Sequence, residues 1–408
     1  MSETNLATDT DLENRKDKIQ TVDRGSISPL LASMVIAASA FVVLFPIGRS
    51  QFNASMWGWL AVLLGLGAAN VIVPRFTLNG LMVKWVSIVG FFGFMALFPI
   101  GRAGSTMTDF GLFVIFGAVV AGMNLTQGYA GQISLAQAAF MGIGAYVSVL
   151  LDFGETISVM GFSWELPNLP FLLTIPIAIM VSMMLSVLIG FPALRVQGPW
   201  LAFVTLAFNL LVFLFLNNED EITRGSRGMR VLRDDFKVLG IDMLSPGRFY
   251  YVGLAYLILA LGIVWWVVKC PWGRALKALR DNPGRARSLG VDVRAYTLLA
   301  FAIGSGLAGG AGALYARQVE YIEPRSFYIN QSFDFLLATV IGGLGTLAGP
   351  LIGSSAITLL ADHLRFTGGW YRVWFGLFVI VMMLIAPEGI AGTFNRFRAW
   401  FQARNEGA

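Results

Sequence analysis

Two residue types on which many enzymes and metal proteins depend are nearly missing from this chain. Its 408 residues include one cysteine, Cys270, and one histidine, His363. A single cysteine excludes a disulfide framework or a cysteine metal cluster within the chain, and a single histidine excludes a multi-histidine metal site. The sequence also lacks the motifs G-x4-G-K-[ST], H-E-x-x-H and G-x-S-x-G. We therefore expect a protein that is not an enzyme and that has no ATPase site, cofactor or metal of its own.

Charged side chains are scarce as well. They make up 13% of the chain, against roughly 25% in soluble domains. Hydrophobic residues make up 56%, and several apolar runs approach or exceed the roughly 18 residues that indicate a membrane span. The sequence thus predicts an all-α, polytopic integral membrane helical bundle with about ten or eleven transmembrane segments, some of them broken by glycines. The net charge of +5 is assigned to basic loops that set orientation, not to nucleic-acid binding.

Loop charges predict which ends of the spans face the cytoplasm. The segment 269–294 has seven basic and two acidic residues, which places it inside by the positive-inside rule. The loop 152–170 has three acidic residues and no Lys or Arg, so we expect it outside. Arginines at 396–404 predict a cytoplasmic C-terminus, which requires an even number of crossings after residue 294. Two readings stay open: the run 336–360 forms two short legs around its glycines, or the C-terminus lies outside.

Two glycine-interrupted apolar segments occur, one in each half of the chain. The segment 124–146 has no charged residue but contains three glutamines and an asparagine, and the run 342–345 reads Gly-Gly-Leu-Gly. Irregular backbone at membrane depth is tolerated only where it is buried in protein or lines a cavity, and paired breaks point to a transport site. The alternative is a loop followed by an ordinary packed helix. The candidate pathway residues are Asn124, Gln127, Gly128, Tyr129, Gly131, Gln132, Gly342, Gly343 and Gly345.

Small residues recur every four positions in two of the predicted helices. Such faces let helices approach closely in lipid, where packing and interhelical hydrogen bonds drive association. We expect these faces to be packing and sliding surfaces of the bundle. They consist of Ser134, Ala138 and Gly142 in one helix and of Gly304, Ala308 and Gly312 in the other.

The predicted spans contain few ionisable groups. Segments 110–151 and 296–316 have no Asp, Glu, Lys, Arg or His. A proton-coupled carrier needs a titratable group near the midplane, so energy is expected from outside the chain, or the protein is a passive channel.

The basic segment 271–289 reads as an amphipathic helix–turn with apolar positions at Leu276, Leu279 and Leu289. Asn282 and Pro283 are expected to cap and begin a second short helix. A short exposed helix between two spans suits a permease that receives force from a separate ATPase. The alternative is a basic loop that serves only topology.

Seven short motifs follow one another over residues 109–392. They are GYAGQISL at 128–135, GIGAY at 142–146, PALRVQGPWLA at 192–202, VTL at 204–206, GRALKALRDN at 273–282, GGLGTLAGP at 342–350 and PEG at 387–389. Together they resemble the LivM-type permease subunits of bacterial branched-chain amino acid ABC importers. In that resemblance, 273–282 and 286–290 correspond to the family's coupling loop. The candidate coupling residues are Arg280, Asp281, Asn282, Ala286 and Gly290.

The resemblance implies a multi-pass subunit of the bacterial inner (cytoplasmic) membrane that imports leucine, isoleucine and valine. Its implied partners are a second related permease subunit, forming a heterodimer, two ATP-binding cassette ATPase subunits and a periplasmic substrate-binding protein. Three places depart from the family pattern, at 209–210, 223–228 and 324–327. The alternatives are the same architecture with urea or short-chain amides as cargo, and a self-contained channel or facilitator.

The expected organisation has four parts. Residues 1–28 form a cytoplasmic N-terminal tail, and residues 29–108 form accessory transmembrane helices. Residues 109–392 form the permease core, which includes the coupling loop 269–294, and residues 393–408 form a C-terminal tail.

Overall fold

A computed structural model describes ten stretches of the chain. They are residues 104–154, 156–159, 162–165, 167–193, 199–231, 237–238, 241–242, 246–360, 370–386 and 389–393. All of them belong to one compact unit. The tail predicted for residues 1–28, the spans predicted before residue 104 and the tail after residue 393 lie outside the described residues, so the total number of crossings stays a prediction.

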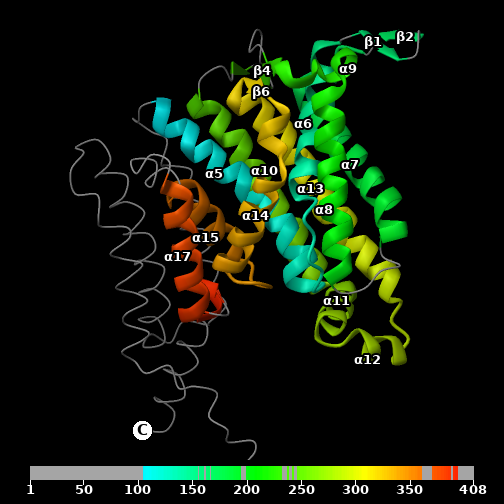
Figure 1. Ribbon diagram of the computed structural model, residues 1–408, viewed down its shortest axis with the longest axis vertical. Helices are drawn as coiled ribbons and strands as arrows, with labels where there is room; N and C mark the ends of the chain where they lie inside the picture. The colour runs from blue at the N-terminus through cyan, green and yellow to red at the C-terminus, as the bar shows by residue number, and fades with distance from the viewer. Residues whose placement is uncertain are drawn as a thin grey trace, which may run out of the picture. The chain divides into compact units, whose positions relative to one another are not determined.

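The described chain is mostly helical, and five helices are long and apolar enough to cross a membrane. This confirms the predicted all-α, polytopic membrane fold (Figure 1). The five are α5 (Gly104–Met123) with the π-helical turn η2 (Asn124–Tyr129), α7 (Phe171–Ala193), α8 (Pro199–Asn218), α10 (Pro246–Lys269) and α13 (Val293–Val319). The shorter helices are α6 (Gln137–Phe153), α11 (Pro271–Asp281), α12 (Pro283–Ser288), α14 (Ile329–Gly342), α15 (Gly349–Ser355) with the π-helical turn η5 (Ala356–Leu360), and α17 (Tyr371–Ile385).

Short strands and turns join the helices at one end. Figure 1 shows β1, β2, β4, β6 and α9 at the end opposite α11 and α12, as the loop charges predicted for segments 152–170 and 269–294. The strands pair antiparallel as β1 (Thr156–Val159) with β2 (Phe162–Glu165), β3 (Met229–Arg230) with β6 (Tyr321–Ile322), and β4 (Lys237–Val238) with β5 (Ile241–Asp242). The short helices here are α9 (Asp220–Thr223), η3 (Gly225–Arg227) and η4 (Pro324–Phe327).

Helix α13 packs mainly against α5, α6 and α7. Its glycines allow main chains to touch. A Cβ atom added to Gly304 would lie 2.6 Å from the Gly122 carbonyl oxygen of α5, and one added to Gly122 would lie 2.5 Å from the Gly304 oxygen. A methyl group on Gly144 of α6 would overlap the backbone of Gly309 in α13. Close approach of this kind is how helices associate in lipid without a hydrophobic driving force.

The structure places the two predicted small-residue faces differently. In α13, Gly304, Ala308 and Gly312 are all buried, and a methyl group on Gly312 would overlap the Met141 carbonyl of α6. The face through Ser134 and Gly142 was predicted wrongly in part. Ser134 is buried in the non-helical segment 131–136, because α6 begins only at Gln137.

Within α6 itself, Ala138 is buried, as a packing face requires. Gly142 does not meet a neighbouring helix backbone. A Cβ atom there would lie 2.9 Å from the ring of Phe327 in η4. The close helix contact in α6 is made two residues later, at Gly144.

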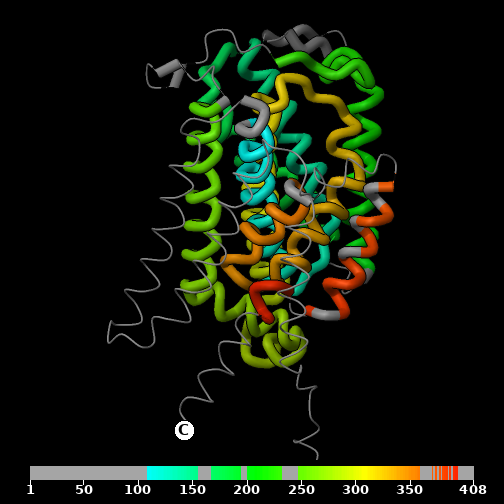
Figure 2. The backbone as a smooth tube through the Cα atoms, turned by 90° about the vertical axis from the view of Figure 1, so that its left-hand side faces the viewer, coloured from blue at the N-terminus to red at the C-terminus, as the bar shows by residue number. Residues whose placement is uncertain are grey.

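The run 336–360 forms two short legs, which is the first of the two alternatives that the loop charges left open. Helix α14 ends at Gly342, and α15 begins at Gly349. A methyl group on Gly342 would overlap the Gly349 carbonyl, and one on Gly353 would overlap the Ala338 carbonyl, so the legs run antiparallel and touch. Both legs contact α5, and Figure 2 shows their orange trace beside the cyan trace of α5.

Candidate functional site

The two broken segments predicted from the sequence meet in space, and Asn124 joins them. Its Nδ2 atom donates to the Thr346 carbonyl at 2.7 Å, and its Oδ1 atom accepts from the Gly345 N–H at 2.8 Å. Asn124 is fully buried. A side-chain amide suits this place because it supplies both a donor and an acceptor to the loop 343–348, whose backbone groups have left the helical ladder.

Gly128 lies at the same junction and receives a side chain from the α11–α12 end of the bundle. The Nη1 atom of Arg280 in α11 donates to the Gly128 carbonyl at 2.6 Å. A methyl group on Gly128 would overlap the Asn124 Oδ1 and the Gly345 nitrogen. The helix α11 is therefore bonded directly to the first broken segment at the point where that segment touches the second.

The backbone between η2 and α6 is held by side chains of other helices. The Leu135 N–H donates to the Thr205 hydroxyl of α8 at 3.0 Å, and the Asn209 amide of α8 donates to the Leu135 carbonyl at 3.1 Å. Ser332 of α14 accepts from the Ala138 N–H at 3.0 Å and from the Asn209 amide at 2.7 Å. These bonds satisfy backbone groups that a membrane interior would otherwise leave without partners.

Gln137 makes a comparable link between helices. Its Nε2 atom donates to the Gly304 carbonyl of α13 at 2.9 Å and to the Val119 carbonyl of α5 at 3.4 Å. The sequence interpretation counted this glutamine without assigning it a role, named Thr205 only as part of the VTL motif, and gave no indication of Ser332. The available signal was a polar side chain within an otherwise apolar helix, which is clearest for Asn209 between Phe208 and Leu210.

The predicted pathway residues gather around this junction with different exposure. Asn124, Gly128 and Tyr129 are buried, as are Gly342 and Gly343, whereas Gln127, Gln132 and Gly345 are partly buried and Gly131 is exposed. Two amide oxygens, Gln127 Oε1 and Gln132 Oε1, are buried and have no hydrogen-bond partner among the described residues. A buried acceptor without a donor is unfavourable by about 1–3 kcal/mol, so each of these two oxygens favours a hydrogen-bond donor.

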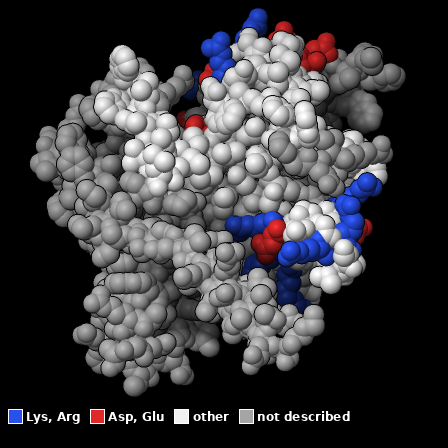
Figure 3. Space-filling model, turned by 60° about the horizontal axis from the view of Figure 1, so that its bottom comes forward, with Lys and Arg blue, Asp and Glu red and all other residues white. Residues whose placement is uncertain are grey.

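Helices α11 and α12 form the basic end of the described chain. The Asn282 side chain accepts from the Arg285 N–H at 3.0 Å, and Pro283 follows it, which confirms the predicted cap and helix start. Leu276 and Leu279 are buried, as their helical spacing predicted. Figure 3 shows basic side chains gathered at this end.

The predicted coupling residues divide into two groups. Arg280, Asp281, Asn282 and Gly290 are exposed overall, whereas Ala286 is buried. Ala286 therefore packs within the protein instead of facing a partner. Leu289 was predicted on the apolar face and is instead 81% exposed, because it follows the last residue of α12 and no longer shares that helix face.

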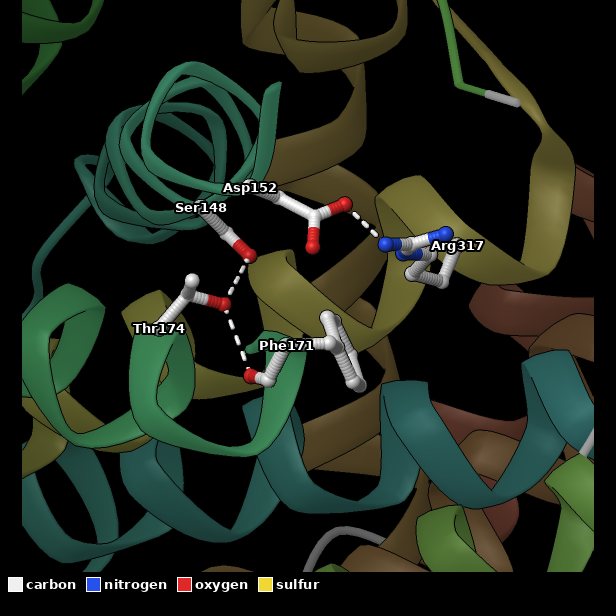
Figure 4. Close-up of polar contacts among 5 residues, drawn as sticks. All are labelled: Ser148, Asp152, Phe171, Thr174 and Arg317. Atoms are coloured by element: carbon white, nitrogen blue, oxygen red, sulfur yellow. Dashed lines mark hydrogen bonds and ion pairs between the residues drawn. The ribbon is translucent and has the colours of Figure 1, made fainter. Parts of the chain in front are cut away.

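A buried ion pair lies at the opposite end of the bundle (Figure 4). Arg317 near the end of α13 bonds Asp152 near the end of α6, and both side chains are at most 10% exposed. The Arg317 guanidinium also lies over the Phe171 ring of α7, 5.2 Å from its centroid. Beside it, the Ser148 and Thr174 hydroxyls are 2.6 Å apart, and Thr174 donates to the Phe171 carbonyl at 2.8 Å. Three helices are thus tied together at this end.

Within the described ranges, no group of three or more His, Cys, Asp or Glu side chains gathers where a metal ion would bind. Broken membrane helices that meet at one place are the arrangement from which many membrane transporters build their substrate site, so the fold and the junction define a transport protein. The chain belongs to the family described as the permease component of the branched-chain amino acid transport system, whose family model matches residues 106–387.

Named relatives agree with this family. The chain is 27% identical over 351 residues to the high-affinity branched-chain amino acid transport system permease protein LivM of Escherichia coli K12, covering 79% of this chain and 80% of the relative. It is 28% identical over 309 residues to LivM of Salmonella typhimurium, covering 70% and 68%. It is also 26% identical over 219 residues to an autoinducer 2 import system permease protein, LsrC, of Photorhabdus laumondii, covering 50% and 64%. No solved structure matches the chain.

Proposed function

We propose that this chain is the permease subunit of an ATP-driven importer that moves leucine, isoleucine and valine from the periplasm to the cytoplasm across the bacterial inner membrane. The LivM relatives, named for branched-chain amino acid transport, support this cargo. The observation that carries the mechanism is the Arg280–Gly128 bond, which links the basic helix α11 to the junction of the two broken segments.

The chemistry of the junction suits a zwitterionic solute. The described residues around it offer amide oxygens, at Gln127 and Gln132, and backbone groups of two broken helices. Neutral dipoles of this kind can receive an ammonium group without binding it as strongly as a carboxylate would. In this proposal the Gln127–Gln132 turn contacts the solute, and the glycine loop 343–348 forms the facing wall.

The energy comes from two separate ATPase subunits. The helix pair α11–α12 lies at the end of the bundle opposite the short strands (Figure 1), and Leu289, which follows α12, is exposed. In this proposal Leu289 enters a groove on the ATPase subunit, where its apolar surface is removed from water. A second related permease subunit completes the pathway, and a periplasmic binding protein delivers the solute to the opposite end.

The test is uptake by the assembled complex in proteoliposomes. Labelled leucine enters only with ATP in the wild-type complex, and it does not enter when the ATPase subunits carry a hydrolysis-blocking substitution. Leucine uptake that is equal with and without ATP contradicts the importer and supports a facilitator. ATP-dependent uptake of labelled urea with none of leucine keeps the ATP-driven importer and changes its cargo.

A further inference from the structure

Three glycines form a seat for the side chain of Arg280. A Cβ atom added to Gly345 would lie 2.5 Å from Arg280 Nη1, and one added to Gly131 would lie 3.1 Å from Arg280 Cα. The third, Gly128, accepts the Nη1 hydrogen bond at 2.6 Å. Gly131 and Gly345 also have φ angles of +71° and +73°, a conformation that other residues rarely adopt. Gly345 and Gly131 thus leave room for the guanidinium and its stem, whereas Gly128 contributes its carbonyl and must be small because a methyl group there would overlap Asn124 Oδ1.

From this geometry we infer that Arg280 is the positioning residue through which movement of α11 reaches both broken segments at once. The inference rests on the proposed ATP-driven function and adds a residue and a path to it. It also gives the glycines of the two breaks a second task. They hold the arginine, whereas the sequence pattern assigned them only to the solute pathway.

The bonds around the seat explain why one arginine reaches two segments. Arg280 bonds the Gly128 carbonyl, and Asn124, one helical turn before Gly128, bonds the Gly345 N–H and the Thr346 carbonyl. A displacement of α11 that pulls on Gly128 is therefore transmitted through Asn124 to the loop 343–348. The movement is carried by three hydrogen bonds, each of which joins a side chain, Arg280 or Asn124, to a backbone group of one of the two breaks.

Two kinds of contact hold α11: buried apolar side chains along the helix, and the hydrogen bond of Arg280 to the junction. Leu276 and Leu279 are buried and provide apolar contact, which tolerates sliding because it has no direction. A charge-assisted hydrogen bond is directional and stronger than a neutral one, so it fixes the register between helix and junction. Lys277, one turn earlier, is exposed and forms no hydrogen bond or ion pair with the described residues, which makes it a charge-matched control.

The first test compares Arg280→Ala, Arg280→Lys and Lys277→Ala in the assembled complex, measuring leucine uptake and ATP hydrolysis in the same proteoliposomes. Arg280→Ala lowers the uptake per ATP hydrolysed by about tenfold or more, which corresponds to the loss of one charge-assisted hydrogen bond. Arg280→Lys restores part of the ratio, because an ammonium still donates to the Gly128 carbonyl. Lys277→Ala keeps the ratio. An unchanged ratio in Arg280→Ala overturns the inference.

A second variant tests the seat from its other side. Gly345→Ala places a methyl group against Arg280 Nη1 and lowers the same ratio. If both substitutions act on one contact, the double variant Arg280→Ala with Gly345→Ala is no worse than the poorer single variant. Two losses that multiply show that the residues act separately, and this result overturns the inference.

A third measurement needs no transported solute, so it separates this inference from the proposed cargo. Spin labels are attached at Lys277→Cys and Leu347→Cys in a Cys270→Ser background, and their distance is followed with and without ATP in the assembled complex. With Arg280 present, α11 and the loop move together and the distance stays constant. With Arg280→Ala, the distance changes on adding ATP. If it already changes equally with Arg280 present, the inference is overturned whatever the complex transports.

Discussion

The amide of Asn124 donates to the carbonyl of Thr346 at 2.7 Å, so a single side chain joins two broken helices that are 222 positions apart in the sequence. The same amide accepts from the Gly345 N–H. The loop after α14 thus takes hydrogen bonds from a side chain of the other broken segment instead of from its own backbone. The wall of the proposed pathway is therefore one unit built from both halves of the chain.

Replacing Asn124 with alanine removes both bonds. The Gly345 N–H and the Thr346 carbonyl then lose their partners, each at about 1–3 kcal/mol where water does not replace them. We expect a loss of ATP-driven leucine uptake while the protein still reaches the membrane, measured by uptake normalised to the amount of assembled complex. Asn218→Ala is the control, since that asparagine bonds only its neighbour Asn217 at an exposed position among the described residues. Equal uptake in the two variants would contradict the role of Asn124.

Gly142 and Gly144 of α6 have different surroundings, and this predicts an order of stability for their alanine variants. Gly144→Ala forces a methyl group into the backbone of Gly309, which cannot move without separating α6 from α13. Gly142→Ala meets the Phe327 ring, which can shift, although Gly142→Leu is still expected to abolish transport. Thermal unfolding in detergent should show a larger loss for Gly144→Ala than for Gly142→Ala. Gly262→Ala, with nothing within 4 Å of the added atom, should show little change. The reverse order would contradict the packing of α6 on α13.

The ion pair between Asp152 and Arg317 is buried, so breaking it is expected to destabilise the protein more than breaking a surface ion pair would. Removing one charge, by Asp152→Asn or Arg317→Gln, leaves the other buried without its partner and lowers the free energy of unfolding by about 3–5 kcal/mol. The double variant should lose less than the sum of the two single losses, because no charge is left unpaired. Chemical unfolding of all four forms measures this coupling. Additive losses would show that the two side chains do not interact.

Exposed Leu289 is expected to bind the ATPase subunits. Leu289→Asp replaces an apolar side chain that is worth about 1.5–3 kcal/mol when fully buried, so the affinity for the ATPase should fall by about tenfold or more. Ser288→Asp adds the same charge at the neighbouring exposed position and should have a smaller effect. Titration of labelled ATPase subunits into nanodiscs that hold the permease measures both. An equal loss in the two variants would assign the effect to charge alone.

Sequence patterns predicted the features that depend on neighbouring residues. The apolar runs predicted the described spans, and Asn282 with Pro283 predicted the start of α12, because span length and helix capping are local properties. The glycines at 342–345 indicated a break in the run 336–360, but the sequence left open whether the run forms two legs, which the structure shows.

Features that depend on distant partners were not predicted. Asn209 and Ser332 are 123 positions apart, and nothing in either neighbourhood indicates their hydrogen bond. Four-residue spacing singled out Gly142, whereas the backbone contact occurs at Gly144, because the position where two helices cross decides which glycine is needed. Leu289 was assigned to the same apolar face as Leu276 and Leu279. It follows the end of α12, however, so it does not lie on a face of either helix.

The bond between Asn124 and Gly345 also has a consequence for how the protein is made. The two residues are 221 positions apart, so the ribosome delivers the first to the membrane long before the second. Until α14 and α15 have been inserted, the amide of Asn124 is without its native partners, and the first half of the permease cannot be complete. We expect released chains truncated before residue 345 to be degraded faster than released chains truncated after residue 360, because only the longer chains contain the partners of Asn124.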